Sequence, residues 1–427
     1  MIFYKEPRFR EPEDGFFPID WDAVPVARLF RVETGATPST SNPAFWKDGT
    51  VNWLTPVDLS GLDSDIHVGR SERRVSERAL KETNLTLVPK RSIILSTRAP
   101  VGYAAVLEEP SAFNQGCKAL VPMEGDQLVP EFYCHYLVAN QKSLQALSGG
   151  STFIELSKEN LEKFLVPKPP LDEQLAISEV LSTMDEAILM SKRIIAESRR
   201  LKKGIIRNLF EEGIDHTRFK AFRSGTIPEN WEVAPFGEHC TSHAYGPRFP
   251  SELYFKDGNI SVIRTTDFDE VGIDYNTVPK ATLTLDFAEP HLLRKGDLLI
   301  TRSGTLGLCA VFSESHGLYI PGAYLIRFRM DSSIHPEWLR YYLMSPVGSK
   351  SLTTMAEGGV QKNLKGSAIL SVQIPVPPLP EQLRITDMVD AATAQIKVEV
   401  ARNESLQRLK KGLVQTLLTG KVRVKVN

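Results

Sequence analysis

Two long stretches of the chain carry the apolar spacing of an amphipathic helix. Apolar residues recur three or four positions apart in residues 171–210, and the same spacing returns in residues 379–418. Alternating steps of three and four form the heptad pattern of helices that pack against one another. The predicted seam consists of Ile177, Leu181, Met184, Ile188, Ile205, Leu209, Ile385, Val389, Ala392, Ile396, Leu413 and Leu417.

Each of these helices is too long to bury its own apolar stripe. About 40 residues at a rise of 1.5 Å make a helix of ~60 Å. The pattern therefore predicts that the two helices pack against each other as an antiparallel coiled coil. The alternative is that each helix lies on its own globular domain.

The residues before each helix have a different pattern. Short β-like runs alternate with turn signals and are followed by a short helical stretch, which favours α/β (mixed α+β) globules. The expected strands are residues 92–97, 102–106 and 117–122 in the first segment, and 297–302, 307–312 and 323–327 in the second. The expected short helices are residues 130–138 and 336–343.

The chain is an internal repeat. Trp21 returns as Trp231, 210 residues later, and a Pro-Pro-Leu-x-Glu-Gln segment opens both long helices, at Pro169 and Pro377. Internal repeats mark structural units, so we expect two related halves with pseudo-two-fold symmetry. The predicted division is a first domain at 1–170, a long helix at 171–212, a second domain at 213–378, and a second long helix with a C-terminal tail at 379–427.

Charge and cysteine content narrow the class of protein. Lys plus Arg number 51 and Asp plus Glu 52, so the net charge of −1 gives no direct sign of nucleic-acid binding, although a basic face can be offset by acids elsewhere. The four cysteines form no CxxC pair, which favours reduced thiols in a cytoplasmic protein over a zinc site or disulfides. The sequence contains no run of about 18 apolar residues, so no membrane helix is predicted.

Motifs for catalysis are missing from the sequence. It has no GxxxxGK[ST] phosphate loop, no GxGxxG after a strand, no HExxH and no Asn-Pro-Pro-aromatic tetrapeptide. His239 and His243 stand near Cys240, but no further ligands have matching spacing, so a polar loop is favoured over a metal site. We therefore expect no catalytic residue and no metal, and a binding role.

Four short segments resemble a known family. They are ETGATPST at 33–40, NWLTPVDL at 52–59, STRAPVG at 96–102 and FNQGC at 113–117, and the Pro-Pro-Leu-x-Glu-Gln helix start closes each half. Together they resemble the specificity subunit of type I restriction-modification systems, over residues 7–424.

The resemblance implies a function and a set of partners. Each of two target-recognition domains would read one half of a bipartite, asymmetric site in double-stranded DNA, and the paired helices would set the spacing and dock two modification subunits. Those subunits would bind S-adenosylmethionine and methylate adenine, while a motor-nuclease restriction subunit would use ATP and Mg²⁺. The chain itself would hold no cofactor and catalyse nothing.

Candidate DNA-binding residues are cations, amides, hydroxyls and an aromatic in turn-rich segments, because Arg and Lys suit phosphates and guanine while Asn and Gln suit adenine. In the first half they are Thr37, Ser39, Thr40, Thr55, Arg98, Asn114, Gln115, Lys118 and Thr152. In the second half they are Arg248, Arg264, Thr266, Arg302, Tyr324, Lys362 and Asn363.

Less specific interpretations stand beside these. Arg98 and Arg302, matched through the Thr-Arg pairs at 97–98 and 301–302, could each pair with a carboxylate inside its own domain. Asn114 could simply form a turn. In the internal repeat, the segment Asn114–Gly116 of the first half is matched with residues 320–322 of the second half. For the whole chain, the alternatives are a self-sufficient restriction-modification enzyme or methyltransferase, and a protein-only coiled-coil scaffold.

Overall fold

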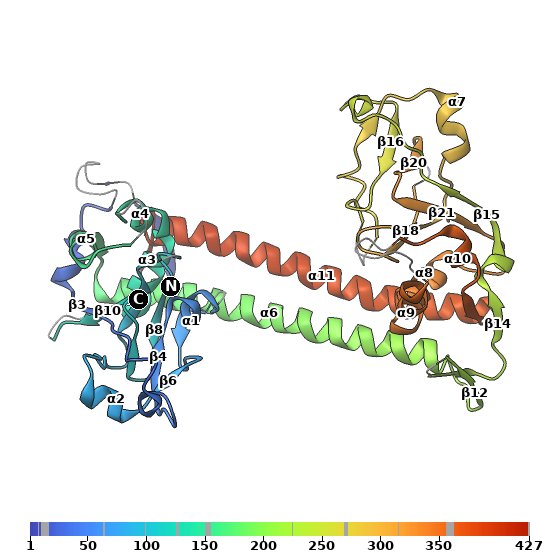
Figure 1. Ribbon diagram of the computed structural model, residues 1–427. Helices are drawn as coiled ribbons and strands as arrows, with labels where there is room; N and C mark the ends of the chain where they lie inside the picture. Colours follow the sequence, from blue (N-terminus) through green and yellow to red (C-terminus); the bar gives the residue numbers. More distant parts are fainter. Residues whose placement is uncertain are drawn as a thin grey trace. The chain divides into compact units, whose positions relative to one another are not determined.

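A computed structural model describes residues 1–6, 8–9, 17–62, 65–98, 100–124, 128–149, 155–223, 225–268, 272–314, 316–355 and 363–425 (Figure 1). The chain forms two compact units. Unit 1 is Met1–Ile194 with Glu399–Asn427, and unit 2 is Ile195–Val398. The helices α6 (Leu171–Glu211) and α11 (Leu379–Leu417) each contribute one part to both units.

Unit 1 contains a five-stranded sheet and a three-stranded sheet. The larger sheet has the order β3-β10-β7-β8-β5, and its strands are Phe30–Thr34, Cys117–Pro122, Ile93–Ser96, Ala104–Leu107 and His67–Val68. The smaller has the order β6-β4-β9, with strands Arg74–Val75, Val51–Leu54 and Ser111–Phe113. Two-stranded pairs join β2 (Asp22–Pro25) to β11 (Leu165–Lys168) and β1 (Ile2–Lys5) to β23 (Val422–Lys425). Its short helices are α1 (Pro56–Ser60), α2 (Glu77–Glu82), α3 (Pro130–Ala139), α4 (Gln141–Ala146) and α5 (Lys158–Lys163).

Unit 2 repeats this plan. Its four-stranded sheet has the order β15-β21-β18-β19, with strands Cys240–Tyr245, Leu325–Met330, Leu298–Thr301 and Cys309–Val311. Its three-stranded sheet has the order β17-β16-β20, with strands Lys280–Ala281, Ile260–Ile263 and Tyr319–Pro321. The pairs are β14 (Glu232–Pro235) with β22 (Gln373–Val376), and β12 (Phe219–Phe222) with β13 (Gly225–Pro228). Its short helices are α7 (Leu285–Ala288), α8 (Pro336–Met344), α9 (Pro346–Thr354) and α10 (Gly366–Leu370). The mixed α/β fold and the tandem repeat predicted from the sequence are confirmed.

The long helices run antiparallel in unit 1. Position 185 of α6 lies beside 410 of α11, 188 beside 403, and 191 beside 399. The predicted seam residues are buried or half-buried throughout both helices. At its ends the seam also joins a globular core: Leu181 and Leu417 belong to one cluster with Trp21 and Phe132, and Leu209 and Val389 to another with Trp338. The helices therefore pack on each other and on the globules, so the two sequence-based alternatives combine.

The centre of the helix pair in unit 1 is polar and hydrogen-bonded. The Ser191 hydroxyl donates to Glu399 Oε1 at 2.7 Å, and Asn403 Nδ2 donates to the carbonyl of Ile188 at 3.1 Å. Lys410 forms an ion pair with Asp185, whose side chain is only 8% exposed. Buried polar groups that have partners fix the register of two helices, because a shift would leave each group unpaired.

The Pro-Pro-Leu-x-Glu-Gln segment ties each long helix to its globule. Glu173 accepts a hydrogen bond from the indole of Trp21, and Glu381 accepts one from Trp231, both at 3.1 Å. The next residue, Gln174 or Gln382, accepts from the backbone N–H just before α3 or α8, at 3.0 and 2.8 Å, and donates to the proline carbonyl before its own helix, at 2.9 Å in both. Both tryptophans are fully buried, as expected for packing residues.

The two glutamates differ in their second partner. In unit 1 the buried Arg423 donates to both oxygens of Glu173, at 2.7 and 2.8 Å, and also binds Glu6 and Asp20. In unit 2 Glu381 instead contacts His216 Nε2 at 2.8 Å. Each glutamate thus binds the segment that follows the other long helix: Glu173 of α6 binds Arg423, and Glu381 of α11 binds His216.

A ring from the globule meets the helix pair in each unit. In unit 1 the buried His135 of α3 lies 3.9 Å from Asp185, and burial lowers the pKa of its imidazole to about 3. In unit 2 the hydroxyl of Tyr341 on α8 donates to Asp390, and Lys202 lies 5.9 Å from the ring. These contacts position α3 and α8 against the helices.

Truncation of a long-helix side chain should lower stability where that side chain enters a core, and should have little effect where it faces solvent. Leu181 is fully buried, so Leu181→Ala should lower the free energy of unfolding by about 2–5 kcal/mol through lost burial and a residual cavity. The matched control is Leu201→Ala on the same helix, where the side chain is 66% exposed and the expected change is below about 0.5 kcal/mol. Urea unfolding measures both; equal losses would contradict the packing described.

Stability should fall on mild acidification because of His135. Its folded pKa of about 3 lies below the ordinary value of 6.5, so the unfolded chain takes up a proton first. The stabilisation is complete above pH 6.5 and is lost as the pH falls, at up to about 1.4 kcal/mol per pH unit. Urea unfolding between pH 6.5 and 5 should show a shallower dependence for His135→Gln than for the exposed control His316→Gln. The same slope in both variants would remove His135 as the cause.

Candidate nucleic-acid interface

In unit 1 five segments meet where strands of both sheets end. The backbone passes so closely at Gly35 that a Cβ there would lie 2.2 Å from the carbonyl oxygen of Asn114, so only glycine fits. Asn114 N–H donates to the carbonyl of Leu54 at 2.9 Å, and Thr97 N–H to that of Gly116 at 2.8 Å. We call residues 35–40, 55–58, 97–98, 114–118 and 155–156 the first rim.

Unit 2 has the same close passage of two backbone segments, which we call the backbone crossing. A Cβ at Gly246 would lie 2.0 Å from the carbonyl oxygen of Gly322, whose own N–H donates to Ile263 at 2.7 Å. Arg302 N–H donates to the carbonyl of Tyr324 at 3.0 Å. The second rim consists of residues 246–250, 264–267, 302–303, 322–326 and 363–364.

These hydrogen bonds correct the repeat register at one point. The carbonyls of Ser96 and Thr301 accept from the N–H groups of the following turn glycines, at 2.9 and 3.2 Å, so they are equivalent and 205 residues apart. Arg302 therefore occupies the position of Thr97, and the match of Arg98 with Arg302 is wrong. The repeated Thr-Arg letters are offset by one residue from the backbone equivalence.

The turn before β10 needs a second correction. Strand register pairs Leu54 with Phe113 in unit 1 and Ile263 with Pro321 in unit 2. Residues 114–116 therefore correspond to 322–324, and the sequence match with 320–322 is wrong by two positions. With the β3 and β15 registers, the equivalent rim positions are Thr37 and Arg248, Thr55 and Arg264, Thr97 and Arg302, and Gly116 and Tyr324.

The cations of the first rim are neutralised by a carboxylate that sequence reasoning missed. Glu155 Oε2 accepts from Arg98 Nε at 3.0 Å, and its Oε1 lies 3.7 Å from Lys118 Nζ. Lys118 is 4% exposed; burial lowers the pKa of its ammonium, an effect that Glu155 opposes. Arg98 thus follows the alternative in which it pairs inside the domain. No spacing rule marks Glu155, because it is 57 residues from Arg98 in the sequence.

Polar side chains of the first rim also bind locally. The Asn114 side-chain oxygen accepts from Gly116 N–H at 3.0 Å, which is the turn-forming role. Thr55 begins α1, and its hydroxyl and N–H both donate to Asp58 Oδ2, at 2.6 and 2.8 Å. Thr37 donates to Gln115 Oε1, which leaves the exposed Gln115 amide N–H₂ as a donor. Ser39 and Thr40 are exposed on the adjoining loop.

In the second rim Arg248 and Arg264 are exposed, whereas Arg302 is half-buried. Arg248 is exposed, and Arg302 lies 4.8 Å from the ring centroid of Tyr245 rather than against a carboxylate in the described part of the chain. The residue equivalent to Glu155 is Asn363, which is half-buried and carries no charge. Tyr324 is 58% exposed. The remaining candidates, Thr152 and Lys362, lie outside the described residues.

Arg264 is held by a carboxylate that the sequence search also left out. Asp267, 1% exposed, accepts from Arg264 Nη2 at 2.7 Å and from its Nε at 3.2 Å. The signal that could have revealed this contact is spacing: Thr55 with Asp58 and Arg264 with Asp267 are both three apart, as in a capping box.

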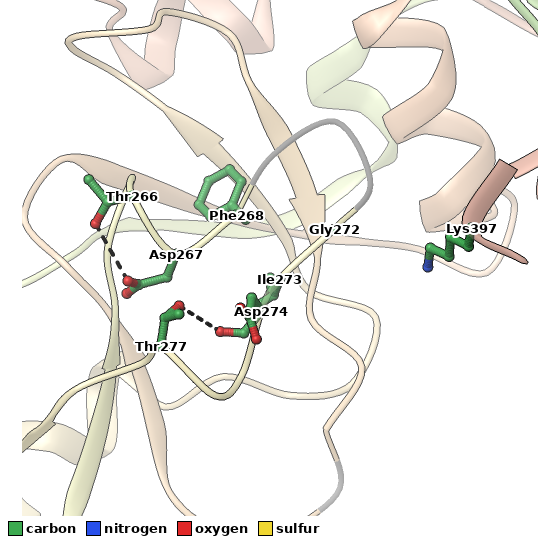
Figure 2. A pocket seen from close by; sticks show the side chains of 8 residues that line it. All are labelled: Thr266, Asp267, Phe268, Gly272, Ile273, Asp274, Thr277 and Lys397. Carbon is green, nitrogen blue, oxygen red and sulfur yellow. Dashed lines mark hydrogen bonds between the residues drawn. The ribbon is translucent and has the colours of Figure 1, made fainter. Parts of the chain in front are cut away.

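A cavity of about 410 Å³ opens beside this turn. Figure 2 shows Thr266 and Asp267 on one side and Lys397, from α11, on the other. Its lining residues are Thr266, Asp267, Phe268, Gly272, Ile273, Asp274, Thr277 and Lys397. The hydroxyl of Thr266, one of the candidate DNA-binding residues, donates to Asp267 at 3.4 Å. Thr266 therefore supports the turn formed by residues 264–267.

Among the described residues, no group of three or more His, Cys, Asp or Glu side chains could hold a metal ion. His239 instead lies 2.8 Å from the Ser333 hydroxyl, and His243 stacks on Phe328 with ring centroids 5.9 Å apart. Over the same part of the chain, no helix has the length and apolar character needed to cross a membrane.

Known proteins share both the sequence pattern and the architecture. Residues 18–198 and 228–408 each match the family described as Type I restriction modification DNA specificity domain. The type I restriction enzyme MjaIX specificity subunit of Methanocaldococcus jannaschii is 33% identical over 272 residues, which cover 61% of this chain and 61% of that protein. The MjaVIII specificity subunit of the same organism is 24% identical over 441 residues, covering 100% of this chain and 98% of that protein.

A solved structure agrees at the level of the fold. The S subunit of a type I restriction-modification system from M. genitalium has a TM-score of 0.57 at 16% identity, covering 99% of this chain and 100% of that one. Two family domains in tandem therefore account for most of the chain. With its repeated rims and its two long helices, the chain belongs to the type I restriction-modification DNA specificity family.

Proposed function

We propose that this chain is the sequence-specific DNA-binding subunit of a type I restriction-modification complex. Each rim reads one half of a bipartite, asymmetric site in double-stranded DNA. The bound complex then directs adenine methylation and DNA cleavage by partner subunits. This chain selects the site and performs neither reaction.

The observation that carries the proposal is one backbone crossing built twice with different side chains. The first rim offers hydroxyls and amides with its cations neutralised. The second offers the exposed Arg248 and Arg264, and Arg302 on the ring of Tyr245. Such residue types make phosphate and base-edge contacts. A shared scaffold with divergent side chains is what two readers of different half-sites require.

The long helices supply candidate docking surfaces for two modification subunits. Several apolar side chains on them face solvent, among them Leu201 at 66%, Val398 at 69% and Leu409 at 55% exposure. These side chains are distributed over both α6 and α11, and we infer that they contribute to the contacts with the modification subunits. We assign S-adenosylmethionine to the modification subunits, and ATP with Mg²⁺ to the motor-nuclease subunit.

The cysteines support a non-catalytic role. Cys117, Cys134 and Cys309 are fully buried, and burial raises the pKa of each thiol. A thiol in that state is a poor nucleophile. These three cysteines are therefore no candidates for a nucleophile.

A domain exchange tests the proposal. Residues 1–168 are replaced by the corresponding segment of a relative, and the methylome of cells carrying the chain with its partners is sequenced. One half-site should change while the other half-site and the spacer stay the same. The matched control exchanges residues 213–378, which should change only the other half-site.

Two further outcomes separate the alternatives. Methyl transfer from labelled S-adenosylmethionine by the purified chain alone would establish the enzyme class. A partner-bound chain that does not bind DNA would establish the scaffold class. A continuous palindrome in the methylome, or two altered half-sites after one exchange, would refute the two-reader assignment.

Removal of the Glu155 charge should strengthen non-specific DNA binding. Glu155→Gln frees the 48%-exposed Arg98 to reach a phosphate, so a plot of log K against log salt for the complex should become steeper by about 0.9. Glu159→Gln, on an exposed glutamate that pairs with Lys163 outside the rim, is the control and should change the slope less. Fluorescence anisotropy across a salt series measures both. Identical slopes for Glu155→Gln and the wild type would place Arg98 away from DNA.

A further inference from the structure

We propose that Arg264 reads a guanine in the half-site of the second domain and that Asp267 is the residue that positions it. The inference rests on the proposed function and deepens it, because it names one base and the contact that selects it.

The ion pair fixes the guanidinium in one orientation. Asp267 Oδ2 accepts from Arg264 N–H at 2.7 Å, and its carboxylate also accepts from Nε and Nη2 of the same residue. The carboxylate is almost fully buried, whereas the arginine side chain is 46% exposed. A buried carboxylate requires partners, so the contact persists while the far end of the guanidinium faces outward.

Of the three guanidinium nitrogens, only Nη1 has no partner among the described residues. Asp267 occupies Nε and one side of Nη2, and the carbonyl of Thr277 lies 3.3 Å from Nη2. No acceptor for Nη1 occurs in the part of the chain that the structure describes. Guanine presents O6 and N7 in the major groove, and arginine is their most common specific partner. Nη1 would donate to one of these acceptors, and Nη2 would donate to the other in place of the long 3.3 Å bond to Thr277.

The first rim shows that this position is exchangeable. Thr55 stands where Arg264 stands, and Asp58 accepts from its N–H at 2.8 Å, as Asp267 does from Arg264 at 2.7 Å. The Thr55 hydroxyl is used up by Asp58 at 2.6 Å and reaches no further. An aspartate three residues later therefore holds a short threonine in one domain and a partly exposed arginine in the other.

Arg264 is better suited to base reading than its neighbours. Among the described residues, neither Arg248 nor Arg302 has a side-chain hydrogen bond that fixes its guanidinium, and Arg302 only rests on the ring of Tyr245. A base contact needs a fixed donor geometry, whereas a phosphate contact tolerates a mobile cation. Arg248 and Arg302 accordingly fit phosphates.

The test uses the assembled complex of the full chain with its modification subunits. Binding is measured on the methylome-defined site and on all single-base variants of the second half-site. Arg264→Lys keeps the charge but loses the fork, so discrimination at one G·C pair should fall about 10- to 100-fold. Asp267→Asn should weaken discrimination at the same pair, and the first half-site should be unaffected.

A matched control separates this role from a structural one. Arg218 forms a 2.7 Å ion pair with Glu229 in the same unit and lies outside the rim, so Arg218→Lys should leave the base preference unchanged. Melting temperatures are recorded for every variant. A merely structural ion pair would lower the melting temperature and leave discrimination at every base pair as it was.

A second measurement needs no altered protein. Each guanine of the second half-site is replaced by 7-deazaguanine, which lacks the N7 acceptor. One replacement should weaken wild-type binding and have little further effect on Arg264→Lys. A second half-site without guanine, or equal penalties in both proteins, would overturn the inference while leaving a bipartite site intact. Absence of a bipartite site in the wild-type methylome would instead refute the proposed function.

Discussion

The close passage of two backbones at Gly35, and again at Gly246, is the constraint on which both rims depend. At each crossing a Cβ atom would come within 2.2 Å of a carbonyl oxygen, so no other side chain fits without movement of the chain. The crossing brings the ends of the two sheets together and leaves the loops beyond them at the surface. Because backbone atoms make the junction, the loop side chains can vary while the scaffold stays fixed. The side chains of the two rims can therefore differ without a change in the backbone scaffold.

Polar contacts at other places fix what the crossing cannot. Glu173 and Glu381 join each long helix to a buried tryptophan, and the polar centre of the helix pair in unit 1 fixes its register. Each of these groups is buried with a partner, so a slipped arrangement would leave unpaired donors and charges. The start of α3 in unit 1 is in turn held to α6 by the hydrogen bond from Val129 N–H to Gln174. Specificity of arrangement in this unit thus comes from polar groups, while burial of Leu181 and its neighbours supplies stability.

The sequence predicts the large features because they depend on local periodicity. The heptad steps of residues 171–210 and 379–418 correspond to α6 and α11, and the Trp and Pro-Pro-Leu repeats correspond to equivalent contacts in the two units. It does not predict the finer register. The match of Arg98 with Arg302 fails by one residue, because backbone hydrogen bonds between distant segments decide equivalence. The partner Glu155 was missed for the same reason, because it is 57 residues from Arg98 in the sequence. Asp267 is only three residues from Arg264, so its spacing could have revealed that contact. Candidate residues can therefore be chosen by type, but their free or paired state needs the structure.

The most direct test of the account is photocrosslinking from the rims to DNA. A benzophenone amino acid is placed at Gln115 or Tyr324 in the full complex bound to its site, with Tyr4 and Phe219 as exposed aromatic positions outside the rims. The account predicts that position 115 crosslinks to one half-site, position 324 to the other, and the control positions to neither. Crosslinks from both rim positions to the same half-site, or from the control positions alone, would contradict it.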